Sequence, residues 1–188
     1  MLDWFKNKQL PSFWLDYIDS FKETSETFIV FNTLQENNNL LAISLISTAN
    51  NKIFLNTNET FFLESIKNSS FTDKDNASIE ILSVNTFIEK LVKYIGNSFL
   101  VGYNTNITTD AITNILKNNS LSKLRNNVLD IEIMFNKYKE TNDKNYSLSE
   151  MCKELNIPLP VTKSINEELL TISLIFINLK QKLNISTK

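Results

Sequence analysis

The stretch Thr27-Phe28-Ile29-Val30-Phe31-Asn32-Thr33 decides the fold of this 188-residue chain. Its four consecutive apolar residues, two of them β-branched, predict a compact strand that we expect to stop at the polar Asn32. Residues 40–48 and 52–56 predict two further strands, and the Asn50-Asn51 pair between them predicts a tight hairpin turn. The domain therefore opens as a meander of three strands.

Helical patterns and short apolar segments alternate over the rest of the chain. Ser83 is the expected N-cap and Gly96 the expected end of the first long helix. The sequence between residues 59 and 76 has no regular pattern. An α/β domain with a mixed sheet follows from this order. The predicted strands are 98–101 and 127–130, and the predicted helices are 84–95, 109–117, 131–138, 149–155 and 166–183.

The composition removes several classes of function. The chain has no histidine, which excludes histidine-based zinc sites and catalytic triads, and its two glycines exclude a glycine-rich phosphate loop. Nineteen Lys and Arg residues against 21 Asp and Glu residues give a net charge of −2, which argues against a strongly basic nucleic-acid binder. The single cysteine, Cys152, is typical of a packing residue in a reducing compartment.

The first residues do not resemble a signal peptide and no apolar run could cross a membrane, so we expect a cytoplasmic protein.

Residues 1–22 form a separate, aromatic segment ahead of the domain at residues 27–184. Their spacing predicts an amphipathic helical extension. Two interpretations remain open at this point: the helix packs on the domain, or it docks onto a protein partner. The aromatic residues available for either role are Trp4, Phe5, Phe13, Trp14 and Tyr17.

Four motifs in order resemble those of the DnaQ-like, or DEDD, 3′–5′ exonuclease superfamily, which includes DNA polymerase III epsilon subunits and ribonuclease T. The motifs are residues 28–33, Leu100-Val101-Gly102-Tyr103-Asn104, Val128-Leu129-Asp130, and Tyr146-Ser147-Leu148 followed by residues 152–157. The resemblance implies a ribonuclease H-like fold: a mixed sheet of five strands, with strand two antiparallel, flanked by helices. It also implies a cleft at the ends of the first and fourth strands, facing the last helix.

The resemblance further implies two divalent metals held by four carboxylates, because paired metals clamp the attacking and leaving oxygens of a phosphoryl displacement. This sequence departs from the family at those positions. Asn32, Leu34, Thr108 and Glu167 stand where the family has acids, and Thr162 stands where it has the general base. One carboxylate could hold a metal only weakly, at Glu167, so we expect no metal cofactor and no catalytic residue.

These departures favour a pseudo-exonuclease that acts through protein binding or through weak binding of single-stranded nucleic acid or a nucleotide. Loss of the carboxylates reduces the repulsion of phosphate, which would allow binding without metal. The candidate binding residues beside the old cleft are Thr33, Tyr103, Asn104 and Lys163.

The alternative is an active metal-dependent 3′–5′ exonuclease of the epsilon type that uses Mg²⁺ or Mn²⁺ in a shifted site. Such a site would be built from the remaining acids of the same region, namely Asp110, Asp130, Glu132 and Glu167.

Overall fold

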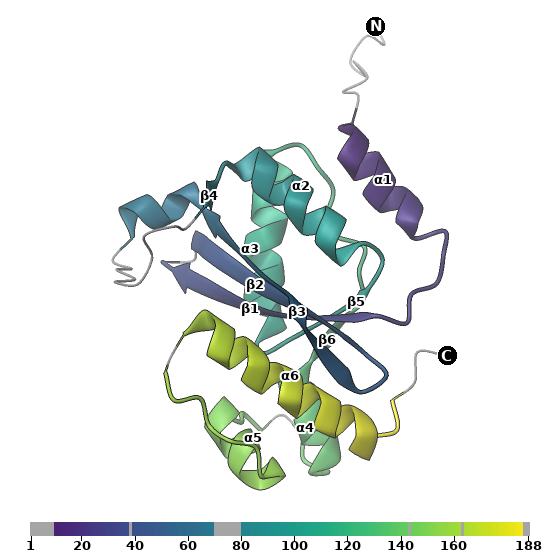
Figure 1. The fold of residues 1–188 in the computed structure, drawn as a ribbon, viewed down its shortest axis with the longest axis vertical. Helices are drawn as coiled ribbons and strands as arrows, with labels where there is room; N and C mark the ends of the chain where they lie inside the picture. Colours follow the sequence, from purple (N-terminus) through teal and green to yellow (C-terminus); the bar gives the residue numbers. More distant parts are fainter. Residues whose placement is uncertain (1–9, 38, 70–79, 143, 163, 186–188) are drawn as a thin grey trace, which may run out of the picture.

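A six-stranded sheet forms the centre of the computed structural model, which describes residues 10–37, 39–69, 80–142, 144–162 and 164–185 (Figure 1). The spatial order of the strands is β4-β3-β2-β1-β5-β6. Strand β2 is antiparallel to both of its neighbours, and all other adjacent strands are parallel. The mixed α/β sheet with an antiparallel second strand is therefore confirmed. The strands are β1 (Phe28–Glu36), β2 (Asn39–Ala49), β3 (Lys52–Leu63), β4 (Ile81–Leu82), β5 (Phe99–Gly102) and β6 (Val128–Asp130).

The sheet differs from the predicted one in two places. It has six strands rather than five, because the two residues of β4 are too few to produce a periodic pattern. Strand β3 continues to Leu63, followed by a 3₁₀ turn at Glu64–Asn68, where we predicted irregular structure from residue 59. Pairing of β3 with β2 jumps from Phe54–Ser47 to Glu59–Leu45, and this bulge breaks the alternation that marks a strand in sequence.

The helices cover both faces of the sheet (Figure 1). Ser83 caps the second helix through the Thr86 amide and Gly96 ends it with φ 45°, as predicted. The third helix begins at Thr105, four residues before its predicted start. No helix in the described ranges combines the length and the apolar character needed to cross a membrane. The helices are α1 (Ser12–Ser20), α2 (Val84–Ile95), α3 (Thr105–Asn118), α4 (Ile131–Tyr138), α5 (Leu148–Leu155) and α6 (Ile165–Lys182).

Strand β1 divides the hydrophobic core into two layers. Ile29 and Phe31 pack with residues of α1, α2 and α3, whereas Phe28 and Val30 pack with residues of α4, α5 and α6. Cys152 is fully buried in the second layer and burial raises the pKa of its thiol, which agrees with a packing role. The first half of β1 is therefore buried on both faces.

Helix α1 is joined to the domain by a buried polar contact. The Tyr17 hydroxyl donates to Asn126 Oδ1 at 2.7 Å and accepts from the Arg125 backbone amide at 2.7 Å. Trp14 and Tyr17 are 1% and 3% exposed, so these two residues belong to the core and are not free to contact a partner. Trp4 and Phe5 lie outside the described residues.

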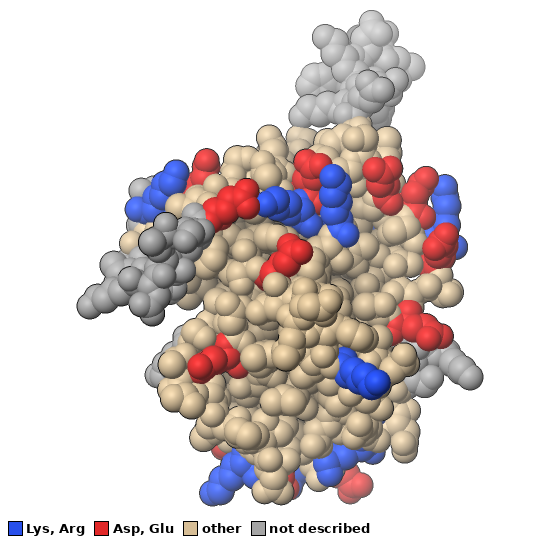
Figure 2. Space-filling view, viewed as in Figure 1, with Lys and Arg blue, Asp and Glu red and all other residues tan. Residues whose placement is uncertain are grey.

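Charges of both signs are interspersed on the face that carries α2 and α6 (Figure 2). On α2, Lys90 pairs with Glu80 at 2.9 Å and Lys93 pairs with Glu89 at 2.6 Å. The middle of this face has few charged side chains, and no broad cationic surface is visible on it. Phosphate binding by a basic surface therefore has no support on this face.

Replacing Tyr17 with Phe should lower the free energy of unfolding by about 1–3 kcal/mol, because Asn126 Oδ1 and the Arg125 amide would be buried without partners. Burial raises the pKa of Tyr17 to about 12, above its ordinary value near 10. Below pH about 10 the phenol is protonated in both states, so its contribution is present in full. Between pH about 10 and about 12 the unfolded chain loses this proton first, so the stability of the native protein should fall.

Urea unfolding of the native protein and the Tyr17→Phe variant at neutral pH and above pH 10 measures both effects. Tyr138→Phe is the matched control, because its hydroxyl makes no hydrogen bond to a described residue. Equal stability of the Tyr17→Phe and Tyr138→Phe variants at neutral pH would contradict the role given to the Tyr17 hydroxyl.

Candidate functional site

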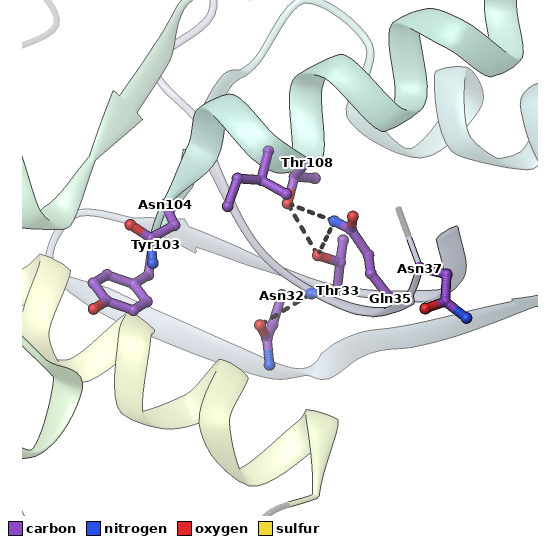
Figure 3. Close-up of a pocket in the computed structure, with 8 residues that line it drawn as sticks. Asn32, Thr33, Gln35, Asn37, Tyr103, Asn104 and Thr108 are labelled. Carbon is purple, nitrogen blue, oxygen red and sulfur yellow. Dashed lines mark hydrogen bonds between the residues drawn. The ribbon is translucent and has the colours of Figure 1, made fainter. Parts of the chain in front are cut away.

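A hollow of about 410 Å³ opens where β1 continues beyond its parallel neighbour (Figure 3). Pairing of β1 with β5 ends at Val30 and Val101, whereas pairing of β1 with β2 continues to Glu36. The expectation that the strand stops at Asn32 is therefore wrong, because β2 supplies backbone partners beyond that residue. The lining residues are Asn32, Thr33, Gln35, Asn37, Tyr103, Asn104, Ile107 and Thr108.

The alternation of β1 sends neighbouring side chains to opposite sides (Figure 3). Asn32 points toward α6, where its Nδ2 donates to the Ile165 carbonyl at 3.1 Å and to Glu168 Oε2 at 3.2 Å. Its Oδ1 accepts from the Thr33 amide at 2.9 Å. Both amide protons and the carbonyl of Asn32 are thus engaged.

Thr33 points the other way, toward α3. Its hydroxyl lies 2.9 Å from the Thr108 hydroxyl, and Gln35 Nε2 donates to Thr33 Oγ1 at 3.1 Å. The same nitrogen reaches Thr108 Oγ1 at 3.5 Å. These three neutral side chains form a closed hydrogen-bonded wall between β1 and α3.

The end of β5 positions Tyr103 at the opposite side of the hollow. Its hydroxyl donates to the Tyr146 carbonyl at 3.0 Å, which fixes the ring. Burial raises the pKa of Tyr103, and Glu132 adds to the shift, so the phenol remains a proton donor at neutral pH. A Cβ on the preceding Gly102 would lie 2.7 Å from Phe31 Cζ, so any larger residue there would force the buried Phe31 ring to shift.

Asp130 holds the start of α3. Its Oδ2 accepts from the Thr105 amide at 2.7 Å and from Thr105 Oγ1 at 3.1 Å. Its Oδ1 accepts from the Glu132 amide at 2.8 Å and caps α4. This contact explains why α3 begins at Thr105. A carboxylate at the start of a helix accepts hydrogen bonds from the free backbone amides and interacts favourably with the positive end of the helix dipole.

The structure brings together five of the nine residues singled out from the sequence. Those five line the hollow and are Asn32, Thr33, Tyr103, Asn104 and Thr108. The other four are placed apart from it or not described.

Leu34 is half-buried and does not line the hollow. Thr162 and Glu167 contact each other, because Glu167 Oε2 accepts from the Thr162 amide at 2.6 Å. Lys163 lies outside the described residues.

The carboxylate that reaches Asn32 is Glu168, which counting from the family motif did not select. Two sequence signals bear on the choice between Glu167 and Glu168, and neither decides it. Glu168 precedes the buried Ile172 by four residues, and Glu167 precedes the buried Thr171 by four, so the buried stripe of α6 admits either acid. Ser164 and Glu167 match a capping pattern, and the Ser164 hydroxyl does accept from the Glu167 amide at 3.2 Å. Gln35, which lies two residues after Thr33 and therefore on the same side of β1, was also missed.

The four acids of the alternative shifted site are not gathered in one place. Asp130 is engaged with Thr105 and Glu132, Glu132 Oε1 accepts from the Tyr146 amide at 2.8 Å, and Glu167 is engaged with Thr162. Asp110 and Asp130 line a second cavity of about 460 Å³ between α3 and β6. Within the described ranges, no group of three or more Cys, Asp and Glu side chains could hold a metal ion.

The residues at the positions where the resembled family has its metal-binding acids do not fit a pair of divalent cations. Mg²⁺ and Mn²⁺ select anionic oxygen ligands, and a pair of them needs several carboxylates to balance four positive charges. Thr108 offers a neutral hydroxyl that is already bonded to Thr33, and Leu34 offers no donor. The Asn32 amide N–H donates to Glu168. An acid in place of Asn32 would face Glu168 with a second carboxylate, and this pair would need a cation between them.

No protein-family model matches the sequence, and no curated protein matches it. Several solved structures do have the same fold. Escherichia coli exonuclease I in complex with a dT13 oligonucleotide aligns with a TM-score of 0.63 and 12% identity over 85% of this chain. This chain spans 42% of the exonuclease I chain.

Two further structures are similar over more of their own length. The RNase domain of the yeast Pop2 protein has a TM-score of 0.62 and 14% identity, covering 90% of this chain and 82% of that one. Exonuclease X in complex with 5′ overhanging duplex DNA has a TM-score of 0.60 and 9% identity, covering 85% and 95%. The chain therefore has the ribonuclease H-like fold of these exonucleases.

Replacing Asn32 with Asp should lower the free energy of unfolding by about 1.5–3 kcal/mol, because two hydrogen bonds from Asn32 would be lost and a second carboxylate would face Glu168. Millimolar Mn²⁺ should restore the stability of the variant, since a cation between two carboxylates binds only the native state. The melting temperature with and without Mn²⁺ measures this effect.

Asn37→Asp is the matched control, because Asn37 is exposed and lines the same hollow. Mn²⁺ should leave its melting temperature, and that of the native protein, unchanged. An equal effect of Mn²⁺ on both variants would show that the Asn32–Glu168 contact does not occupy the position of a cation.

Proposed function

We propose that this protein is a pseudo-exonuclease whose cleft binds the end of a single-stranded nucleic acid without metal and without cleaving it. The observation that carries this proposal is the hydrogen bond from Asn32 Nδ2 to Glu168 Oε2 at 3.2 Å. The uncharged amide N–H satisfies one oxygen of that carboxylate by a hydrogen bond, so this contact is stable without a cation.

The catalytic requirements of metal-dependent hydrolysis support the same conclusion. The reaction needs a metal-activated water and a stabilised leaving oxygen, and both depend on paired cations. With Asn32 and Thr108 at these positions, the described lining of the cleft offers no anionic ligand between β1 and α3. Thr162 cannot accept a proton near neutral pH and its backbone amide is bonded to Glu167.

The choice of nucleic acid rests on the fold and on the position of the hollow. Among the similar structures, exonuclease I is complexed with single-stranded DNA and exonuclease X with 5′ overhanging duplex DNA. The hollow lies at the carboxyl end of β1 and beside the start of α3, where ligands bind in sheets of this kind. The near absence of cations predicts modest affinity.

A protein partner is a second candidate function. One similar chain, with a TM-score of 0.59, comes from the structure of the yeast NOT1 MIF4G domain co-crystallised with CAF1. The buried positions of Trp14 and Tyr17 disfavour α1 as the docking surface, so a partner would have to contact another face.

Fluorescence anisotropy with a labelled 12-nucleotide single strand in EDTA and low salt tests the proposal. The strand should bind and should remain intact after prolonged incubation with Mn²⁺. Ile107→Glu should weaken binding by about fivefold or more, because Ile107 lines the hollow and a new carboxylate there repels the strand.

Ile133→Glu is the matched control, since both isoleucines are exposed on helices, at 58% and 70%, and Ile133 lies away from the hollow. It should bind within about twofold of the native protein. Cleavage that requires Mn²⁺ and disappears in a Glu168→Gln variant would overturn the proposal in favour of an active exonuclease.

A further inference from the structure

Strand β6 leaves one edge of the sheet open. It is the last strand in the spatial order, and β5 is its neighbour. The Leu100 amide donates to the Asn127 carbonyl at 2.9 Å, so Asn127 and Leu129 direct their backbone groups toward β5. The amide and carbonyl of Val128 therefore point away from β5, and neither has a partner among the described residues. This edge can pair with one further extended chain.

The second cavity, between α3 and β6, lies beside this open edge. Its volume of about 460 Å³ is within the range of ligand sites, about 300 to 1,000 Å³. Val128 and Ile133 line it and are 37% and 70% exposed, and the half-buried Leu124 lines it with them. Val128 pairs with Leu100, which packs in the core layer of α3, so the Val128 side chain also faces α3. An extended chain beside β6 would direct alternate side chains into this cavity.

The charges that line the second cavity favour a basic ligand. Its described lining has two acids, Asp110 and Asp130, and one lysine, Lys123, which together give a charge of −1. Asp110 is exposed on α3 and forms none of the ion pairs found between described residues. A lysine or arginine side chain can therefore pair with Asp110 without displacing an existing ionic partner.

We propose that the second cavity binds an extended, basic peptide segment of a protein partner. The peptide adds a strand to β6 through the backbone of Val128. It seats an apolar side chain against Val128 and Ile133, and it places a lysine or arginine beside Asp110. A compact ligand could fill the cavity without using the Val128 backbone, whereas an extended peptide uses both.

This site is separate from the hollow at the end of β1. The two cavities have no lining residue in common, although both lie along α3. Ile107 lines only the hollow, and Ile133 lines only the second cavity. The proposal therefore goes beyond the binding of a nucleic-acid strand and does not depend on it.

Two labelled, blocked seven-residue peptides test the proposal. In each, threonines surround one valine and one lysine placed two residues apart, and the two peptides have these residues in opposite orders. Residues two apart share a face of a strand, so both side chains would enter the cavity. At least one peptide should bind in fluorescence anisotropy at low salt. Replacing its lysine with glutamate should weaken binding by about fivefold or more, because a carboxylate would then face Asp110.

Methylation of the peptide backbone tests strand pairing. N-methylation of every second amide removes the donors from one edge of the peptide, and the alternate pattern removes them from the other edge. The pattern that faces β6 should weaken binding by about fivefold or more, because hydrogen bonds to β6 are lost. The pattern that faces solvent should change binding by less than about twofold.

Val128→Pro is the corresponding change in the protein. Proline removes the outward amide of Val128 and leaves the bonds of Asn127 and Leu129 to β5 in place, as an edge strand allows. It should weaken peptide binding by about fivefold or more. Val128→Thr keeps the amide and a similar shape, so it is the matched control and should bind the peptide more tightly than the proline variant. Melting temperatures verify that both variants fold.

Asp110→Asn tests the ionic contact and should weaken binding of the lysine peptide by about two- to fivefold. Asp16→Asn is its matched control, because Asp16 is an exposed aspartate on α1 that does not line the second cavity. Its affinity for the peptide should equal that of the native protein.

Failure of both peptides to bind would overturn the proposal. Equal effects of the two methylation patterns would show that the ligand does not pair with β6 and would overturn it as well. Neither result bears on the proposed function, which is measured with a nucleic-acid strand. Ile107→Glu, which should weaken binding of that strand, should leave peptide binding within about twofold of the native value.

Discussion

The site depends on one feature of the sheet: β1 extends beyond the end of its parallel neighbour β5. As far as Phe31 the strand is buried on both faces, and its residues alternate between two core layers. Beyond Val30 it loses β5 but keeps β2, so its backbone stays ordered while one edge opens. The same alternation that fills the core then directs Asn32 to α6 and Thr33 to α3. The extension of β1 therefore determines where the hollow opens and which helix each of its two walls contacts.

Four polar residues of this opening are held in place by hydrogen bonds: Asn32, Thr33, Gln35 and Thr108. Asn32 uses every polar atom of its side chain on the backbone of β1 and on α6. On the other side, Thr33, Gln35 and Thr108 close a wall of neutral hydrogen bonds. Acids in these places would repel one another without cations, whereas amides and hydroxyls are stable by themselves. The neutral side chains at these positions therefore stabilise the cleft without any need for a cation.

Asp130 shows how an acid near such a site can serve the fold instead of the chemistry. Its two oxygens accept three hydrogen bonds from Thr105 and Glu132, so it joins β6 to the starts of α3 and α4. Tyr17 has a comparable role at the other end of β5, where it connects α1 to Asn126. In both cases one side chain satisfies several buried backbone or amide groups, which makes the helix it anchors part of the domain.

The sequence by itself determined the strand order of the meander, the caps of α2, and the five residues that meet at the hollow, because these follow from local periodicity and from motif spacing. It did not determine which of two adjacent acids faces Asn32, since helix phase differs by roughly 100° between Glu167 and Glu168 and is fixed only by packing of α6 on the sheet. It also could not show that β1 continues past Asn32, because that depends on β2 as a distant partner. Tertiary structure alone showed that Gln35 and Ile107 join Asn32, Tyr103 and Thr108 in one hollow, because these residues come from three separate segments of the chain.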